Sequence, residues 1–371
     1  MSEKKTIVHV IDDLGRGGAE TLLVDLLKDL SDYYNIVLVT LSSVSDFDKN
    51  EIRCQQQYSL EYKGLRDIPV AILKLRKIIK KHNPVLVRSQ LYWSTLIARM
   101  ACPKKIPFVF SVHVTLSDGS FSFTKKGKLL KWLEKITYTS HQNIIGVTQE
   151  VLDDYKKAIG LKGKSYLLNN YVNDAYFTNA IEYIPPSNGH FKLVAVGNPK
   201  KQKNYELLIN TFRLLNSSGI SCDIYGNGGN SGYDSMLQQE IDRDKLNIFL
   251  KGKSANVYDH LKNYDAFIMP SWFEGFGIAV GEAMAVGLPV FLADIRVLRE
   301  VSHNNAIFFN PADAKELADK IQSFIKGEVD AIALSQNGKE ITKQFYSKKK
   351  YLTKLLAIYE DCMAKTTLVH T

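Results

Sequence analysis

The chain has 371 residues, which is enough for two domains of ordinary size. A hydrophobic fraction of 45% and a charged fraction of 23% are typical of a globular protein and exclude a disordered one. The four cysteines are scattered and the eight histidines form no metal-binding motif, so neither a disulfide framework nor a zinc site is expected. A reducing cytoplasm fits this cysteine usage. No apolar run approaches the ~18–20 residues that span a membrane.

The net charge of +9 is unevenly distributed. Residues 1–185 carry 26 basic against 19 acidic side chains, and the remainder carries 22 against 20. An anionic membrane surface or simple solubility explains this excess, and no nucleic-acid motif accompanies it. The segment Lys125–Lys135 is basic and amphipathic with Trp132 in its centre. It either rests on a membrane interface or packs on its own domain.

Short apolar runs alternate with helical patterns in the first half, which predicts a parallel sheet covered by helices on both faces. The first run leads straight into Asp12 and Asp13, so it predicts a strand rather than a signal peptide. Helices are expected at Ala19–Leu30 and Ile68–Lys81. The expected strands are Thr6–Ile11, Ile36–Leu41, Val85–Val87, Phe108–Val112, Asn143–Val147 and Tyr166–Leu168.

Turn-forming residues at 169–190 interrupt this pattern and predict a domain boundary. Strand–helix alternation then resumes, with helices expected at Tyr205–Leu215 and Ile278–Val286. The expected strands are Phe191–Val196, Cys222–Tyr225, Ile248–Leu250, Ala266–Met269, Val290–Ala293 and Ile307–Phe309. The prediction is therefore an α/β protein with two Rossmann-like, doubly wound domains and a ligand cleft between them. The predicted parts are a first domain at 1–172, a linker at 173–190, a second domain at 191–346, and a helical tail at 347–371 that packs back toward the first domain.

Two carboxylates follow one strand of the second half. Glu274 lies in a glycine-containing loop after the strand, and Glu282 lies one turn inside the next helix. Free N–H groups at that helix start suit a phosphate, and carboxylates accept hydrogen bonds from sugar hydroxyls. The simpler alternative is that both are ordinary glutamates favoured by the helix dipole.

Basic and glycine-rich loops follow two other strands. Gly197-Asn-Pro-Lys-Lys-Gln-Lys-Asn204 places three lysines between a strand and a helix, where they would neutralise a diphosphate or form a solvated loop. Gly15, Gly17 and Gly18 follow the first strand without the spacing of a dinucleotide fingerprint.

Other polar residues were weighed in the same way. His113 ends a buried strand and either orients a hydroxyl or has a structural role. Asp242-Arg-Asp244 spells a metal motif, but its polar helix-end context predicts a solvated turn.

Together these residues resemble the family 4 retaining glycosyltransferases, which have the GT-B fold. Glu274 and Glu282 match that family's E-x7-E pattern, and Gly197 with Lys203 matches its glycine-to-lysine spacing. Gly17-Gly18-Ala19-Glu20 matches the amino-terminal signature, and His113 matches the active-site histidine of the first domain. The resemblance runs over nearly the whole chain.

The resemblance implies the roles of the site residues. The first domain would bind the acceptor and the second a nucleotide-sugar donor, UDP-linked by expectation. His113, Glu274 and Lys203 would be catalytic. The donor site would comprise Gly197, Asn198, Lys203, Gly226, Phe276, Gly277, Ile278 and Glu282. Gly17, Gly18 and Glu20 would form the loop for donor phosphates and acceptor.

The resemblance also implies the chemistry and the setting. The transfer would retain the anomeric configuration without a metal or other cofactor, by front-face attack on a donor whose diphosphate is stabilised electrostatically. The acceptor would be a glycan or a lipid-linked glycan in surface polysaccharide biosynthesis. The protein would be cytoplasmic, with a peripheral position on the inner face of the membrane.

One departure from the family pattern leaves other functions open. Asn198 stands where the family often has arginine, so Lys200 or Lys201 would have to supply the missing charge. The alternatives are a disaccharide phosphorylase, a sugar-nucleotide epimerase, or a donor-binding subunit with little turnover.

Overall fold

The chain divides into two compact units. Unit 1 comprises Met1–Asn170 and Lys349–Thr371, and unit 2 comprises Tyr171–Lys348. Residues 173–190, which the sequence predicted to be a linker, are thus part of unit 2. The computed structural model describes residues 4–15, 17–117, 125–186, 189–216, 219–228, 232–254 and 256–367.

Unit 1 is built on a wholly parallel seven-stranded sheet in the order β3-β2-β1-β4-β5-β6-β7. The chain adds β2 and β3 on one side of β1 and then crosses over to β4 on the other, which is the doubly wound arrangement. The strands are β1 (Thr6–Ile11), β2 (Asn35–Thr40), β3 (Gln56–Ser59), β4 (Leu86–Gln90), β5 (Phe108–Val112), β6 (Gln142–Gly146) and β7 (Ser165–Leu167).

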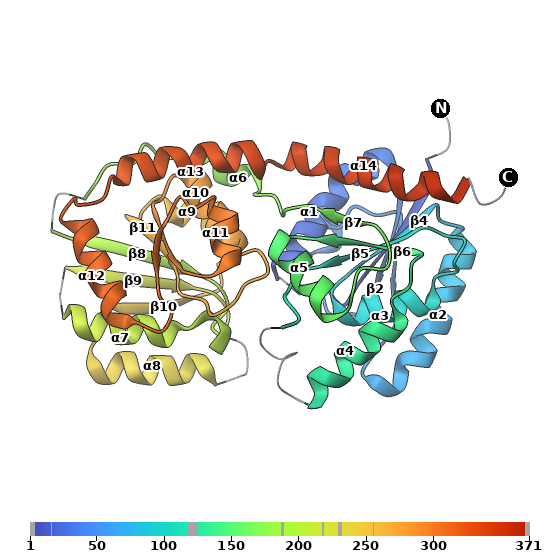
Figure 1. Ribbon diagram of the computed structural model, residues 1–371, viewed down its shortest axis with the longest axis horizontal. Helices are drawn as coiled ribbons and strands as arrows, with labels where there is room; N and C mark the ends of the chain where they lie inside the picture. Colours follow the sequence, from blue (N-terminus) through green and yellow to red (C-terminus); the bar gives the residue numbers. More distant parts are fainter. Residues whose placement is uncertain are drawn as a thin grey trace. The chain divides into compact units, whose positions relative to one another are not determined.

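Helices cover both faces of this sheet (Figure 1). The helices of unit 1 are α1 (Gly18–Tyr33), α2 (Ile68–His82), α3 (Tyr92–Ala101), α4 (Lys125–Thr137), α5 (Gln149–Ala158) and α14 (Lys348–Thr367). Side chains of α1 and α14 contribute to one hydrophobic core, and side chains of α2, α3 and α5 contribute to the other.

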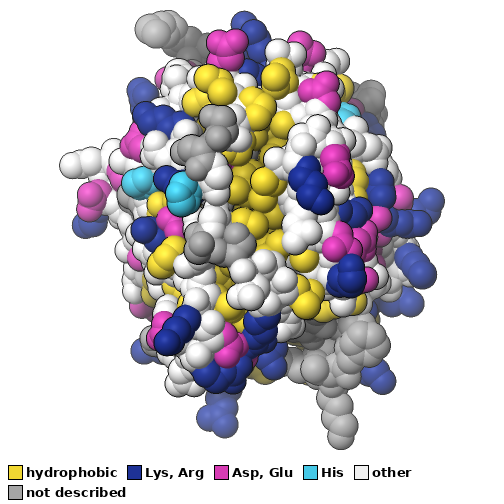
Figure 2. All heavy atoms as spheres, turned by 90° about the vertical axis from the view of Figure 1, so that its left-hand side faces the viewer, with side chains coloured by type: hydrophobic (Ala, Val, Ile, Leu, Met, Phe, Trp, Pro, Cys, Tyr) yellow, Lys and Arg dark blue, Asp and Glu magenta, His cyan; other side chains and the backbone are white. Residues whose placement is uncertain are grey.

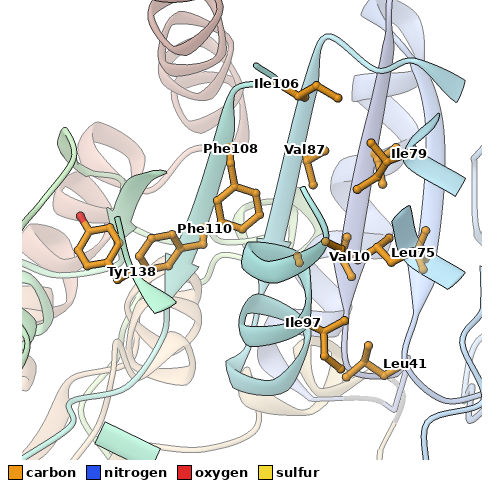
Figure 3. Close-up of a cluster of buried hydrophobic side chains, with 14 of the residues drawn as sticks. Val10, Leu41, Leu75, Ile79, Val87, Ile97, Ile106, Phe108, Phe110 and Tyr138 are labelled. Carbon is orange, nitrogen blue, oxygen red and sulfur yellow. The ribbon is translucent and has the colours of Figure 1, made fainter. Parts of the chain in front are cut away.

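The alternation of side chains along a strand explains how one sheet feeds two cores. In β1, Val8 and Val10 point to the α2–α3 side, whereas Ile7 and Ile11 point to the α1–α14 side. Figure 3 shows Val10, Val87, Phe108 and Phe110 among the side chains of the first of these cores. Both faces are apolar, so the central strands read as continuous hydrophobic runs, as buried parallel strands do.

Unit 2 has a parallel six-stranded sheet in the order β10-β9-β8-β11-β12-β13. Its strands are β8 (Phe191–Val196), β9 (Ile220–Tyr225), β10 (Ile248–Gly252), β11 (Ala266–Met269), β12 (Val290–Ala293) and β13 (Ile307–Phe309). Its helices are α6 (Asp174–Thr178), α7 (Tyr205–Leu215), α8 (Tyr233–Asp244), α9 (Val257–Leu261), α10 (Ile278–Val286), α11 (Arg296–Ser302), α12 (Ala314–Ile325) and α13 (Ala331–Phe345).

An apolar surface feature lies at the amino ends of the unit 2 strands. A pocket of about 240 Å³ there is lined by Phe191 at the start of β8, Ile220 at the start of β9, and Leu215 and Ile325 from the helices. On the face that Figure 2 shows, hydrophobic side chains form a band bordered by charged ones. Ligands of doubly wound sheets bind at the opposite, carboxyl ends of the strands.

The fold class predicted from the sequence is confirmed, since both sheets are parallel and doubly wound. The sequence missed β3, an edge strand whose residues Gln56 and Gln57 are exposed and polar. None of the helices in the described ranges has the length and apolar character needed to cross a bilayer.

Candidate active site

The candidate active site of unit 2 lies where three neighbouring strands end. β9, β8 and β11 are adjacent in the sheet, and the loops after them carry Gly226, Gly197 and Glu274 respectively. Since the strands are parallel, their carboxyl ends meet at one edge. The structure therefore gathers residues that are up to about eighty positions apart in the sequence.

Hydrogen bonds tie the lysine loop after β8 to the loop after β11. The Gln202 side-chain amide donates to Phe273 O at 2.8 Å, and the Trp272 N–H donates to Gln202 O at 2.9 Å. The buried Asn204 side chain donates to Pro270 O at 3.1 Å. These contacts fix Lys203 opposite Glu274.

Lys203 and Glu274 form an ion pair. Lys203 Nζ lies 2.7 Å from Glu274 Oε1, and the side chains are 18% and 8% exposed. A Cβ on Gly197 would lie 2.9 Å from Lys203 Cε, so glycine at 197 makes room for the lysine chain beside the end of β8. The pair thus places one cation and one carboxylate at the carboxyl ends of the strands.

Asn198 is fixed to the next loop rather than presenting a charge. Its Oδ1 accepts a hydrogen bond from Asn227 N at 2.9 Å. A Cβ on Gly226 would lie 2.3 Å from Gly197 O, so only glycine lets these two loops approach so closely. Lys200 and Lys201 are exposed. The residue that departs from the family pattern therefore joins the loops after β8 and β9.

The start of α10 has the features expected of an anion-binding helix terminus. Gly277 precedes Ile278 with a φ of 73°, a conformation that glycine adopts without strain. Phe276 is buried and packs edge-on against Tyr346 with ring centroids 5.3 Å apart. The first N–H groups of a helix lack intrahelical acceptors, so this start can bind a negatively charged group.

Glu282 is held apart from the Lys203–Glu274 pair by a different partner. It lies on the second turn of α10 and accepts a hydrogen bond from the Tyr176 hydroxyl of α6. Burial raises the pKa of Glu282 to about 7, and the Tyr176 hydrogen bond opposes this increase. Sequence reasoning missed Tyr176 because it lies in the segment that was predicted to be a linker.

The glycine loop of unit 1 begins α1. Gly17 is the N-cap of that helix, and a Cβ there would lie 2.4 Å from Glu20 Oε2. Asp13 Oδ1 accepts a hydrogen bond from Gly15 N at 2.8 Å, which holds the turn. The structure therefore brings Gly17, Gly18 and Glu20 together at the end of β1, whereas Arg16 lies outside the described residues.

His113 follows β5 in unit 1 with its Nε2 buried and without a hydrogen-bond partner among the described residues. Burial, and secondarily the charge of Arg88, lowers the pKa of His113 to about 4. The ring is thus neutral near neutral pH. Arg88 itself is buried and donates hydrogen bonds to Tyr359 at 2.9 Å and Tyr351 at 3.2 Å, both on α14.

The decoy at Asp242–Asp244 is accounted for by arginines. Asp244 pairs with Arg213 at 2.5 Å and Arg243 at 2.9 Å. Within the described ranges, no group of three or more His, Cys, Asp or Glu side chains is placed to hold a metal ion.

Comparisons with known proteins place this fold and site in a family. Residues 16–176 match the model of Glycosyltransferase Family 4, and residues 179–341 match that of Glycosyl transferases group 1. The chain therefore belongs to the family 4, group 1 glycosyltransferases, and both of its units follow the GT-B fold.

Two curated relatives match part of the chain. The lipopolysaccharide core biosynthesis mannosyltransferase LpsB of Rhizobium meliloti is 27% identical over 142 residues, which are 37% of this chain and 40% of that protein. The O-antigen chain mannosyltransferase RfbU of Salmonella typhimurium is 30% identical over 219 residues, 56% of this chain and 57% of that protein. The chain thus aligns with about half the length of these relatives.

A solved structure matches nearly the whole chain. The Anabaena protein HepE, in complex with UDP and glucose, superposes with a TM-score of 0.77 at 18% identity. The match covers 96% of this chain and 100% of HepE. At this identity the likeness establishes the GT-B fold, and the activity is argued from the site.

Proposed function

We propose that this glycosyltransferase moves a sugar from a UDP-linked donor to a lipid-linked or glycan acceptor in surface polysaccharide biosynthesis, with retention of anomeric configuration. The observation that carries the proposal is the Lys203–Glu274 pair beside Gly197 at the carboxyl ends of the strands. Polysaccharide-related activities of the relatives LpsB and RfbU support the acceptor class, and the UDP bound to HepE supports the donor class.

The donor occupies unit 2 with its parts divided among the three loops. Lys203 and the start of α10 around Phe276–Ile278 bind the diphosphate, and Glu282 accepts hydrogen bonds from the ribose hydroxyls. Glu274 accepts hydrogen bonds from the donor sugar. Gly197, Asn198 and Gly226 shape the backbone against which the donor lies.

The chemistry needs no carboxylate nucleophile. The bond between the anomeric carbon and the diphosphate oxygen breaks, and the acceptor oxygen bonds to the same face of the sugar. The acceptor's proton passes to the departing diphosphate, whose charge Lys203 stabilises. The neutral His113 ring and the Gly17–Glu20 loop of unit 1 orient the reacting hydroxyls. Activity should persist in EDTA, and its loss there with recovery on adding a divalent cation would contradict metal independence.

A membrane-facing surface on α4 supports a lipid-linked acceptor. Leu129, Trp132 and Ile136 recur at helical spacing on this helix and are 49%, 56% and 53% exposed. Lys128 and Lys135 beside them are exposed as well. An apolar stripe flanked by lysines fits the interface of an anionic bilayer, where each cation adds ~1 kcal/mol of binding. We therefore propose a peripheral position on the cytoplasmic face of the membrane.

Liposomes test this surface. Full-length protein should sediment with vesicles of phosphatidylglycerol and phosphatidylcholine, and Trp132→Ser should reduce the bound fraction several-fold. Tyr33→Ser is the matched control, because Tyr33 is a 53% exposed aromatic on α1, on the other face of the sheet. No binding at low salt, or equal losses in both variants, would remove the membrane from the proposal.

A thermal-shift screen of nucleotide sugars tests the donor. A ligand at 100 times its dissociation constant stabilises the folded state by ~2.7 kcal/mol, so the correct base and sugar should give the largest shift. UDP sugars should exceed ADP, GDP and CMP sugars. A larger shift from another base would overturn the uridine assignment, and no shift from any sugar nucleotide would contradict the donor site itself.

A further inference from the structure

Residues 171–181 are pinned along α10 at both ends. Val172 N donates to Tyr346 O at 2.8 Å, and Ile181 N donates to Val286 O, the last residue of α10, at 2.8 Å. Lys339 Nζ adds a hydrogen bond to Ile181 O at 2.9 Å. The segment that the sequence predicted to be a linker is therefore a fixed part of the unit 2 surface that faces α10.

The helix allows this segment to come unusually close. A Cβ on Gly281 would lie 3.0 Å from Val172 Cγ2, so the absence of a side chain at 281 lets the segment pack against the helix backbone. Asn173 caps α6 by accepting a hydrogen bond from Ala175 N at 2.9 Å. Both features fix α6, and with it Tyr176, next to Glu282.

Tyr176 bridges Glu282 and α9. Its side chain is only 8% exposed, and its hydroxyl donates to the Glu282 carboxylate. Its ring packs edge-on against Tyr258 of α9, with centroids 5.7 Å apart. A carboxylate that receives one buried hydrogen bond has fewer orientations available, while its remaining lone pairs stay open to other donors.

We propose that Tyr176 is a positioning residue that orients the Glu282 carboxylate to accept hydrogen bonds from the ribose diol of the nucleotide. The inference rests on the donor site proposed above and adds a residue from outside the matched motifs. Tyr176 acts only through Glu282, so its contribution should vanish for a nucleotide that has no ribose hydroxyls.

The test compares the affinities of UDP and 2′,3′-dideoxy-UDP, measured by calorimetry on the full chain. Glu282→Ala should weaken UDP about 10–100-fold and bring its dissociation constant to that of the dideoxy nucleotide. Tyr176→Phe should weaken UDP about 3–10-fold and leave the dideoxy nucleotide unchanged. Tyr176→His, which keeps a donor, should recover part of the difference.

Tyr183→Phe is the matched control, because this buried hydroxyl of unit 2 has no hydrogen-bond partner among the described residues. It should change neither dissociation constant. The ratio of the two constants on one preparation is independent of the folded fraction, so partial misfolding of a variant does not obscure the result.

The outcomes separate the inference from the proposed function. If Glu282→Ala removes the discrimination while Tyr176→Phe keeps the wild-type ratio, the role of Tyr176 is wrong and the donor site stands. If Tyr176→Phe weakens both nucleotides equally, its role is structural and the inference also fails. If wild-type protein does not distinguish the nucleotides, or does not bind UDP, the donor assignment fails and this inference with it.

Discussion

At the scale of single residues, Lys203 has two competing demands. In the structure it pairs with Glu274, yet the proposed donor needs it for the diphosphate. Hydrogen bonds to charged groups contribute ~1.5–3 kcal/mol, which is about 10–150-fold in affinity. We expect Lys203→Met to weaken UDP binding by roughly this factor in calorimetry. Lys326→Met, at an exposed lysine of unit 2, is the control, and wild-type affinity in the Lys203 variant would exclude its role.

Glu282 gives a pH-dependent prediction that needs no ligand. Burial raises its pKa to about 7 in the folded state, so folding favours the neutral carboxyl. The stability that this preference provides is complete below the ordinary pKa of glutamate, about 4.3, and is lost as pH rises through 7. Tyr176 is the titratable group bonded to Glu282, and Tyr258 lies behind Tyr176.

Glu282→Gln removes this ionisation while keeping an acceptor for Tyr176. Its free energy of unfolding relative to wild type should therefore rise by ~1–3 kcal/mol between pH 4 and pH 8. Urea titrations at several pH values measure this difference. A difference that is constant with pH would mean that the carboxyl ionises normally in the folded protein.

At the scale of elements, α4 is anchored by a buried ion pair. Arg99 Nη2 of α3 lies 2.7 Å from Glu134 Oε1, with the side chains 0% and 6% exposed. The Tyr155 hydroxyl of α5 also donates to Glu134 at 2.8 Å, and the guanidinium lies 4.0 Å from the centre of the Phe110 ring. These contacts fix the face of α4 that turns inward, which leaves the Trp132 stripe facing out.

Removing one partner of a buried pair leaves the other charge without compensation, which typically costs ~3–5 kcal/mol. We expect Glu134→Ala to destabilise unit 1 by about this amount in urea unfolding. Asp319→Ala removes half of a surface pair, Lys315–Asp319, whose side chains are 75% and 59% exposed. Its effect should be below ~0.5 kcal/mol, as for most exposed pairs. Equal effects of the two substitutions would contradict the anchoring role.

The elements also show what the sequence could predict. Buried strands such as β1 and β8 are continuous apolar runs, so hydrophobicity alone located them. β3 was missed because its residues are polar and its pairing depends on the neighbouring β2. The local motif identified Lys203 and Glu274, but their ion pair depends on loop contacts between residues about seventy positions apart. Tyr176 carries no local signal, because its role comes from the packing of α6 on α10.

At the scale of the whole molecule, the chain returns to its first unit after completing the second. Leu355, Ile358 and Tyr359 of α14 are buried in the core that α1 and the sheet of unit 1 share. Arg88 is bonded to Tyr351 and Tyr359 of the same helix, and Lys164 pairs with Asp361 at 2.5 Å. Unit 1 is thus incomplete without the last part of the chain.

This predicts different fates for the two units on truncation. A chain ending at Lys348 should lose the cooperative unfolding transition of unit 1, because its core would be exposed to water. Unit 2 keeps all of its own elements and should still bind UDP. A chain ending at Ala364 keeps the buried residues of α14 and should behave as wild type. Two intact transitions in calorimetry of the shorter chain would contradict this view.

The Lys203–Glu274 pair has a consequence for which molecules can remain in the proposed site. Its charges already balance each other when the site is empty, so a ligand must replace both partners. A sugar nucleotide offers phosphate to the lysine and hydroxyls to the carboxylate. A nucleotide that has lost its sugar takes the lysine and strands a carboxylate that is 8% exposed. The pair would therefore act as a coincidence detector, which favours the intact substrate and expels the spent carrier.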